Sequence, residues 1–338
     1  MTRLFVGGYE EAGAQGLYPL DLTAGALSAG PPLADPVNVS AGIRVPGTAC
    51  WFLVDERAGR LVLVDAERDW GVLASVPSGG EGPCHLAQDR STMLLAVAHY
   101  DSGTLALFRL DPTSGLPIQP PALHQNTGRG PDEERQAGPH VHWVGFGPDD
   151  RLYVVDLGLD QLLSFAVDAE GGTLGEPVVA YVAPPGSGPR QLAFHPHLPI
   201  AYLVSELVPS LTVLRLGEDG TFTAAPPLPT LPAGEVPASL GGAILIGPDA
   251  TRLYVSNRGH DSIATFRLDP QGEASFIAAT PSGGRSPRFL LAADAALLVA
   301  HETAGGVTLL PLDNNGVPRP TAARAEIPGA AFLGVIDA

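Results

Sequence analysis

A repeated pattern of short strands constrains this chain of 338 residues more than any other feature. The stretch 138–165, GPHVHWVGFGPDDRLYVVDLGLDQLLSF, has relatives that begin at Gly82, Gly188, Gly241 and Ser286. Each copy predicts a strand, a turn, a second strand, a polar turn and a third strand. Self-similarity at a spacing of about 48 residues is typical of the blades of a β-propeller.

The two ends of the chain complete the set of repeats. Weaker copies lie in 48–65, TACWFLVDERAGRLVLVD, and in 3–22, RLFVGGYEEAGAQGLYPLDL, and the latter lacks a leading strand. Residues 328–338, PGAAFLGVIDA, predict that missing inner strand, which would close the first blade and remove an exposed edge. The sequence therefore predicts an all-β, seven-bladed β-propeller with four antiparallel strands per blade. Residues 1–338 are expected to form one domain, because no linker or shift in composition divides them.

The charge balance narrows the possible partners. The chain has 36 acidic and 19 basic residues, a formal charge of -17, and every basic residue is arginine. Nucleic acid is therefore not an expected partner, and an anion would be held by arginine or by neutral donors. No apolar run approaches the roughly 20 residues of a membrane span. The chain opens on a strand pattern instead of a signal peptide, so a cytoplasmic location is expected.

Polar residues recur where two strands of each blade meet. The start of the first strand and the end of the second lie at the same rim of a propeller blade. The first strands align at Cys84, His142, Arg190, Gly242 and Arg288. The second strands align at His99, Asp156, Glu206, Asn257 with Arg258, and His301. His140 shares a strand face with His142, since alternate residues point the same way. Ionisable residues that differ from blade to blade indicate a site for an anionic small molecule.

Other interpretations of some of these residues remain open. The two histidines of the H-x-H pair, with Glu206 or His99, could ligate zinc or another divalent ion. No motif supplies three or four ligands, however, and neighbouring arginines would repel a cation, so no metal and no cofactor are expected. Cys50 and Cys84 are predicted to be small buried side chains without a disulfide. Arg258 has an alternative structural role, in which it pairs with Asp261 or with a carboxylate of another blade.

Five motifs in this order resemble one known family. They are GPCHLAQD, RQAGPHVHWVGFGPDDRLYVVDLGLDQLLSF, GPRQLAFHPHLPIAYLVSEL, LYVSNRGHDSIATFRLD and SPRFLLAADAALLVAHE. Together they look like the bacterial lactonase family of seven-bladed propellers, which includes 6-phosphogluconolactonase and the fungal 3-carboxy-cis,cis-muconate lactonizing enzyme. The family's active-site residues in P-H-x-H, G-P-R, S-E-L and S-N-R-G match His142, Arg190, Glu206 and Arg258. The family motif usually continues as G-P-R-H, whereas this chain has Gln191, a departure expected to affect local packing only.

The resemblance implies hydrolysis of a sugar lactone, 6-phosphogluconolactone to 6-phosphogluconate. Glu206 or His142 would act as base, His142 as proton donor, and Arg190 and Arg258 would bind the oxyanion or the phosphate. Further substrate contacts are expected from His140, Arg288, His99, His301 and Asn257. One alternative is a cycloisomerase that acts on a carboxymuconate with the same groups. Another is a propeller that only binds a ligand or a protein.

Overall fold

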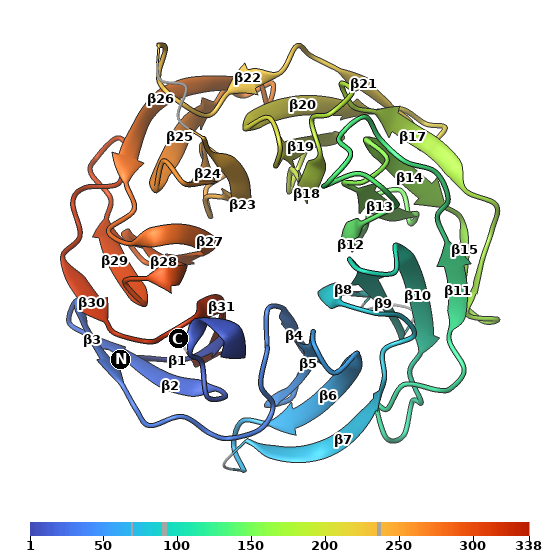
Figure 1. Cartoon of the computed structure of the whole chain (residues 1–338), viewed down its shortest axis with the longest axis horizontal. Helices are drawn as coiled ribbons and strands as arrows, with labels where there is room; N and C mark the ends of the chain where they lie inside the picture. The colour runs from blue at the N-terminus through green and yellow to red at the C-terminus, as the bar shows by residue number, and fades with distance from the viewer. Residues whose placement is uncertain (69, 90–92, 235–237, 338) are drawn as a thin grey trace. The chain divides into compact units, whose positions relative to one another are not determined.

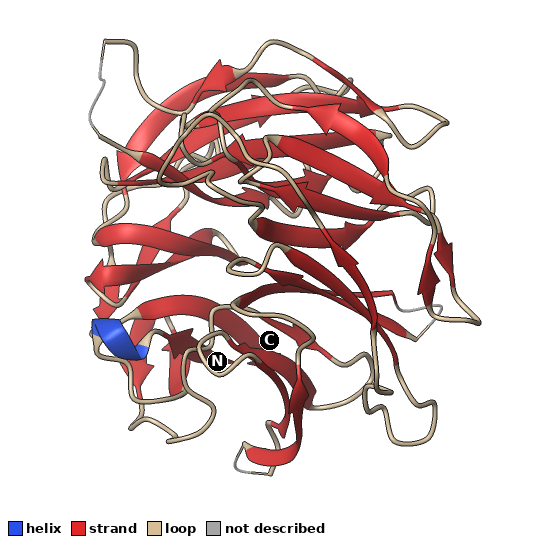
Figure 2. Cartoon of the chain, turned by 45° about the vertical axis from the view of Figure 1, so that its right-hand side comes forward, coloured by secondary structure: helices blue, strands red, loops and turns tan. Residues whose placement is uncertain are grey.

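The computed structural model describes residues 1–68, 70–89, 93–234 and 238–337. Strands form nearly all of its regular structure, and within these ranges one 3₁₀ turn, η1 (Glu10–Ala12), accompanies them (Figure 2). None of the described residues forms a helix long and apolar enough to cross a membrane. The chain divides into two compact units. The first contains residues 1–39, 191–215 and 224–338, and the second contains 40–190 and 216–223.

The strands form seven main sheets in the described residues, as the repeats predict. Three sheets are β4 (Gly42–Arg44), β5 (Cys50–Asp55), β6 (Arg60–Asp65), β7 (Gly71–Pro77); β8 (Pro83–Asp89), β9 (Leu94–His99), β10 (Thr104–Arg109), β11 (Ala122–Gln125); and β12 (Val141–Phe146), β13 (Leu152–Asp156), β14 (Gln161–Phe165), β17 (Val178–Val182). Three more are β18 (Pro189–Phe194), β19 (Ile200–Ser205), β20 (Ser210–Leu216), β21 (Phe222–Ala224), extended by β22 (Leu228–Pro229); β23 (Leu240–Ile246), β24 (Arg252–Arg258), β25 (Ser262–Leu268), β26 (Ala274–Pro281); and β27 (Arg285–Ala293), β28 (Ala296–Ala304), β29 (Val307–Pro311), β30 (Ala323–Ala325). A short ribbon, β15 (Val167–Asp168) and β16 (Thr173–Leu174), stands apart from them.

The seventh sheet joins the two ends of the chain. It runs in the order β3 (Ala26–Ala29), β2 (Tyr18–Thr23), β1 (Thr2–Gly8), β31 (Ala330–Asp337). The last strand lies antiparallel beside β1, with Val6 opposite Leu333 (Figure 1). The predicted completion of the first blade by the C-terminal strand is therefore confirmed, and the fold is a seven-bladed β-propeller.

The second strand of each blade is buried on both faces. All six residues of β9, LLAVAH, are buried, and so are all six of β19, IAYLVS. Blades pack face to face, so these strands show continuous apolar runs instead of alternation. In the first unit, Leu4 and Val6 of the N-terminal blade share one core cluster with Leu298 and Ala300 of the neighbouring blade. Removing apolar surface of this kind from water is the main stabilising contribution to the fold.

Several inner strands carry a β-bulge near their start. Register shifts leave Cys84, His142 and Arg288 as the extra residues of β8, β12 and β27. The shift in β23 between Gly241 and Ile244 includes Gly242. A bulge turns a side chain out of the regular alternation and is common beside functional sites. The predicted equivalence of these four positions is therefore confirmed by the register.

Candidate active site

At or near the end of the second strand of five blades, a residue pairs across the hairpin with the residue five positions later. Such pairs join His99 with Thr104, Asp156 with Gln161, Ser205 with Ser210, Asn257 with Ser262, and Asp55 with Arg60. In the other two blades the equivalent residues are His301 and Gly8. His301 donates its backbone N–H to the carbonyl of Gly306, five positions later, and Gly8 lies opposite Ala330 next to a register shift between β1 and β31. We name these residues the anchor row: Gly8, Asp55, His99, Asp156, Ser205, Asn257 and His301. The residues that follow them form the site row: Tyr9, Glu56, Tyr100, Leu157, Glu206, Arg258 and Glu302.

The register corrects the predicted position of Glu206. The sequence pattern aligns Glu206 with His99, Asn257 and His301, but Ser205 occupies that position in the anchor row. Ser205 and Glu206 are both polar and adjacent at the end of this strand. Sequence similarity between the blades therefore selects Glu206, the charged one of the two. Glu206 instead belongs to the site row, with Arg258. Because successive residues of an extended chain point in opposite directions, this shift of one residue gives Glu206 different neighbours.

Three anchor-row side chains, those of His99, Asp156 and Asn257, bind the loop that leads in from the preceding blade. His99 Nε2 lies 3.0 Å from Ser78 Oγ in the loop after β7, and its Nδ1 lies 3.1 Å from the Thr104 carbonyl. Asn257 Nδ2 donates to the carbonyl of Thr230, at 3.0 Å, in the loop before β23. The imidazole and the amide therefore tie two neighbouring blades together.

Asp156 and His301 are buried polar anchors as well. Asp156 accepts a hydrogen bond of 2.6 Å from Asn126 in the loop after β11. His301 Nδ1 lies 3.2 Å from the Gly306 carbonyl, and a Cβ built on Gly284 would meet the His301 ring at 2.5 Å. The predicted substrate contacts His99, Asn257 and His301 have 0% of their surface exposed. Their hydrogen bonds and burial support a structural role in place of contact with substrate.

We expect the buried anchor histidines to make the fold sensitive to acid. Burial is the main cause that lowers the pKa of both His99 and His301 to about 4, from an ordinary 6.5. Between these pH values the unfolded chain binds protons that the fold excludes. Above about pH 6.5 these two histidines therefore leave the free energy of unfolding unchanged. As the pH approaches 4, that free energy falls by about 3 kcal/mol per histidine. Urea unfolding at a series of pH values measures this loss.

The chain itself suggests the control for this experiment. His301→Asn introduces the residue that the anchor row already carries at Asn257. This variant should lose one of the protons taken up on unfolding, so its stability should fall less steeply between pH 6.5 and 4. An unchanged slope would assign the acid sensitivity to other groups, such as His85, whose pKa burial also lowers to about 4.

Glu206 and Arg258 form a buried ion pair in the first unit. Arg258 Nη2 lies 2.6 Å from Glu206 Oε2, and the two side chains are only 11% and 4% exposed. The backbone between them reinforces the contact, because Gly241 accepts from Arg258 Nη2 and donates to the Glu206 carbonyl. Burial lowers the pKa of Arg258, while the Glu206 carboxylate opposes this shift. Within the described residues, Arg258 Nε is buried and has no hydrogen-bond acceptor.

The structure decides between the two partners suggested for Arg258. Asp261 does not pair with it. The Asp261 carboxylate accepts the backbone N–H groups of Ser286, at 2.7 Å, and Gly259, at 3.2 Å. Arg258 pairs with the carboxylate of another blade, Glu206. Its side chain is therefore both part of a buried salt bridge and adjacent to the predicted catalytic carboxylate.

A second arginine lies close to this pair. Arg288 Nη1 is 3.3 Å from Glu302 Oε2, and its Nη2 donates to the Tyr9 hydroxyl at 2.7 Å. Burial is the main cause that lowers the pKa of Arg258, and the positive charge of Arg288 contributes to the same shift. Sequence reasoning missed Tyr9 and Glu302. The signal that would have found them is their position directly after the anchor row.

The two motif histidines lie in the second unit around Tyr100. The His140 ring stacks on the Tyr100 ring at 4.4 Å between centroids, and the His142 ring meets it edge-on at 5.5 Å. His140 Nδ1 lies 2.8 Å from the Tyr100 carbonyl. A carbonyl only accepts, so Nδ1 carries the proton and Nε2 is the acceptor of the neutral ring. Arg135 donates to the Tyr100 hydroxyl at 3.1 Å.

Arg190 and Cys84 of the second unit are also buried, whereas Cys50 is only half-buried, so the prediction of two buried cysteines is wrong for Cys50. Arg190 is 2% exposed, and its charge is the second cause, after burial, that lowers the pKa of His85. Cys84 is buried with its Sγ 3.5 Å from the Val141 carbonyl, and both Cys84 and Cys50 are free thiols. The prediction of unlinked cysteines is therefore confirmed.

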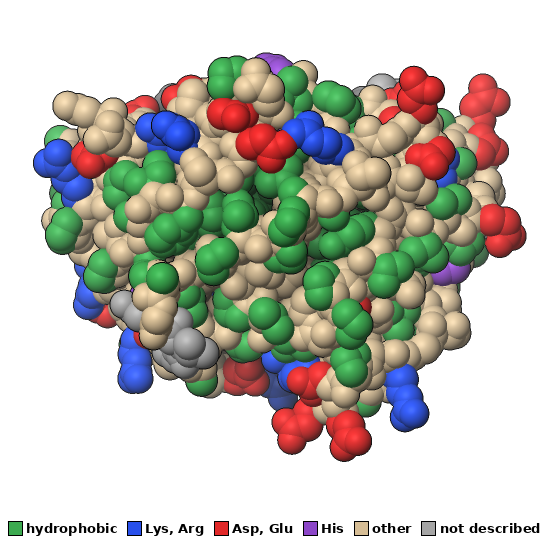
Figure 3. Space-filling view, turned by 90° about the horizontal axis from the view of Figure 1, so that it is seen from above, with side chains coloured by type: hydrophobic (Ala, Val, Ile, Leu, Met, Phe, Trp, Pro, Cys, Tyr) green, Lys and Arg blue, Asp and Glu red, His purple; other side chains and the backbone are tan. Residues whose placement is uncertain are grey.

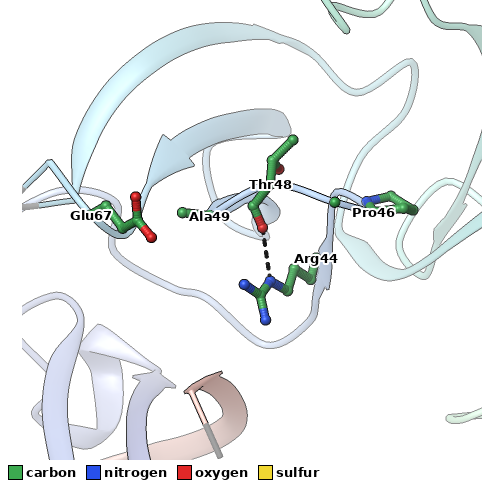
Figure 4. A pocket seen from close by; sticks show the side chains of 6 residues that line it. Arg44, Pro46, Thr48, Ala49 and Glu67 are labelled. Atoms are coloured by element: carbon green, nitrogen blue, oxygen red, sulfur yellow. Dashed lines mark hydrogen bonds between the residues drawn. The ribbon is translucent and has the colours of Figure 1, made fainter.

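A cavity of about 640 Å³ in the second unit does not coincide with these clusters. It is lined by Arg44, Pro46, Gly47, Thr48, Ala49 and Glu67 (Figure 4). Arg44 Nε donates to the Thr48 carbonyl at 2.9 Å, so the one basic group there is already held by its own hairpin.

Carboxylates project from the edges of the face in Figure 3, in keeping with the negative charge of the chain. Within the described ranges, no three His, Cys, Asp or Glu side chains are grouped to hold a metal ion.

Comparison with known proteins identifies the family. The family model for the lactonases with a seven-bladed β-propeller matches residues 3–334. The chain belongs to this lactonase family. A 6-phosphogluconolactonase of Bacillus subtilis strain 168 is 30% identical over 330 residues, which cover 91% of this chain and 90% of that protein. An uncharacterized protein of Lactococcus lactis subsp. cremoris is 32% identical over 322 residues, 93% of each chain.

Solved structures share the fold of this chain. A crystal structure from Lactobacillus plantarum superposes with a TM-score of 0.89 at 26% identity and covers 99% of both chains. A periplasmic gluconolactonase of Pseudomonas aeruginosa gives 0.89 at 24% identity, covering 99% of this chain and 98% of the other, and this likeness concerns the fold alone.

One departure from the lactonase-family motif has a local structural effect. Gln191 follows the G-P-R arginine, and its Oε1 accepts the backbone N–H of Ile244 at 3.3 Å. Ile244 is the first regularly paired residue after the bulge of β23. Gln191 therefore supports the inner strand of the next blade, as the predicted packing role requires.

Proposed function

We propose that this lactonase-family protein hydrolyses 6-phosphogluconolactone to 6-phosphogluconate. The observation that carries the proposal is the buried contact of 2.6 Å between Glu206 and Arg258 in a member of this family. It puts a carboxylate, able to accept a proton, beside a guanidinium, able to donate hydrogen bonds to an anion. The relative named as a 6-phosphogluconolactonase supports the choice of substrate.

The chemistry requires three things of the site. Water adds to the lactone carbonyl and loses a proton, the carbonyl oxygen becomes an oxyanion, and the ring C–O bond breaks as its oxygen gains a proton. In our proposal Glu206 accepts the proton of the attacking water. Arg258 stabilises the oxyanion, and Arg288 binds an anionic group of the substrate. The product is the open-chain hydroxy acid.

The sequence adds two residues of the other unit to this proposal. By the family motifs, His142 would protonate the ring oxygen and Arg190 would bind an anionic group. We assign His99, Asn257 and His301 to the anchor row and leave them out of the catalytic set. The kinetics of His142→Gln and Arg190→Ala, measured beside His301→Asn, test this division: the first two should lose activity and the third should not.

A direct assay tests the proposed function. Purified protein is given 6-phosphogluconolactone, and 6-phosphogluconate is followed with a coupled dehydrogenase against the spontaneous hydrolysis. A parallel reaction contains 3-carboxymuconate. Activity on the lactone alone supports the proposal, activity on the muconate alone supports a cycloisomerase, and activity on neither supports a binding protein.

We expect hydrolysis to continue without metal. Arginine, the only basic residue type besides histidine in this chain, supplies the positive charge in the Glu206–Arg258 cluster, so a Lewis acid is not required to stabilise the oxyanion there. Activity should be the same after treatment with a chelator and gel filtration as in a sham-treated sample. A loss that one divalent ion restores would contradict this expectation and make His140 and His142 candidate ligands.

A further inference from the structure

Tyr9 occupies the site row of the first blade, where the sequence shows only a weak repeat. It follows β1 directly, and its backbone N–H donates to the Gly329 carbonyl at 3.0 Å, next to the closing strand β31. Its side chain is 7% exposed. The position equivalent to Tyr9 carries Arg258 in the sixth blade and Glu302 in the seventh. Tyr9 thus belongs to the same structural row as residues of the charged cluster.

Tyr9 contacts the Arg288 guanidinium in two ways. Its hydroxyl accepts a hydrogen bond of 2.7 Å from Nη2, and its ring lies 4.8 Å from Cζ in a cation–π arrangement. Glu302 holds Nη1 from a third direction, at 3.3 Å, and Ser286 Oγ donates to the same Glu302 oxygen at 3.1 Å. A long, flexible arginine side chain is in this way restrained on both of its terminal nitrogens.

We infer that Tyr9 is a positioning residue, which fixes the Arg288 guanidinium for the anionic group of the substrate. The inference rests on the proposed function, because it assumes that Arg288 contacts the substrate. A fixed guanidinium loses little freedom when the anion binds, and its donors are already oriented. Tyr9 itself needs no contact with the substrate and takes no part in proton transfer.

Three variants separate the contacts that Tyr9 makes. Tyr9→Phe removes the hydroxyl and keeps the ring, whereas Tyr9→Leu removes both. Tyr18→Phe is the matched control: Tyr18 is buried in the same blade, and its hydroxyl accepts the backbone N–H of Gln15 at 3.1 Å. We expect Tyr9→Phe to raise KM for the lactone roughly 3- to 10-fold with a smaller change in kcat. Tyr9→Leu should raise KM further, and Tyr18→Phe should leave it unchanged.

A double-mutant cycle shows whether Tyr9 acts through Arg288. In an Arg288→Ala background, Tyr9→Phe should have no further effect on KM, because the group that it positions is gone. An equal increase in both backgrounds would overturn the inference. Circular dichroism melting of each variant shows whether the loss is one of folding, and a KM that follows the melting temperature would also overturn it.

A second readout does not depend on catalysis. If the wild-type protein hydrolyses no lactone, the proposed function fails, but the restraint of Arg288 can still be measured by NMR of its ¹⁵N-labelled guanidinium, assigned with Arg288→Lys. Rotation about the Cζ–Nε bond should be slow in the wild type and in Tyr18→Phe, and faster in Tyr9→Phe. Equal rotation in all three would overturn the inference independently of any assay.

Discussion

Replacing Arg258 with alanine is expected to lower both activity and stability. Losing a charge-assisted hydrogen bond to the oxyanion should reduce kcat/KM by roughly 10- to 150-fold. The position of Arg258 alone suggests little loss of stability, but its buried contact with Glu206 changes this expectation. Arg258→Ala removes the guanidinium that faces the buried Glu206 carboxylate, and breaking a buried pair of this kind costs about 3 to 5 kcal/mol. Steady-state kinetics and denaturant unfolding on the same preparation measure the two effects.

A second variant separates the two effects. Adding Glu206→Gln to Arg258→Ala removes the carboxylate charge that has lost Arg258, so part of the stability should return while activity stays low. Arg258→Lys should recover only part of the activity, since an ammonium cannot reproduce the planar fork. Arg215→Ala is the control: its ion pair with Glu273 is about half exposed, and such pairs contribute little. Intact catalysis in folded Arg258→Ala would assign Arg258 to the scaffold alone.

Removing residues 329–338 should prevent the protein from folding cooperatively. The deletion takes away the whole inner strand of the first blade; Ala338 itself lies outside the described residues. Phe332 and Leu333 are 5% and 2% exposed, and truncating one such side chain to alanine costs about 2 to 5 kcal/mol. The free energy lost with the strand is therefore comparable to the whole free energy of unfolding of a typical domain, 5 to about 15 kcal/mol. It also exposes the edge of β1.

Thermal melting and gel filtration of the truncated chain measure this effect. Removing only 337–338 is the control, since Asp337 contributes a half-exposed ion pair with Arg3. That shorter deletion should melt close to the wild type. A synthetic peptide of residues 329–338 should restore part of the cooperative transition when it is added to the longer deletion. A melting temperature unchanged by the longer deletion would show that β31 is not needed to complete the blade.

The fold could be predicted because a propeller repeats its constraints. Each blade needs similar strands and turns, so the copies that begin at Gly82 and Gly188 support each other even where one is weak. The closing strand was predictable for a related reason: the N-terminal copy lacks one strand and residues 328–338 supply it. The position of His142 at the rim could be predicted only through its equivalents in the other blades, because the bulge there has no sequence signal of its own.

The site was predictable only to within one residue. Which of two adjacent residues closes a hairpin depends on pairing between strands, and both Ser205 and Glu206 are polar. It was harder still to predict which charged residues form pairs. Glu206 and Arg258 are 52 positions apart, and among 36 acidic residues the sequence does not identify the one that meets Arg258. Tyr9 was missed because the repeat in the first blade is too weak to align it with Glu302.

The anchor row and the site row divide two tasks between neighbouring residues. Because His99, Asp156 and Asn257 hold incoming loops, the residue after each of these anchors can change without releasing a loop. The natural row already contains Tyr, Glu, Leu and Arg on the same framework. For protein engineering this means that a library limited to the site-row codons, beginning with Glu56, Tyr100 and Leu157, samples new binding chemistry while the loop anchors stay intact. A change of ligand would then require no new scaffold.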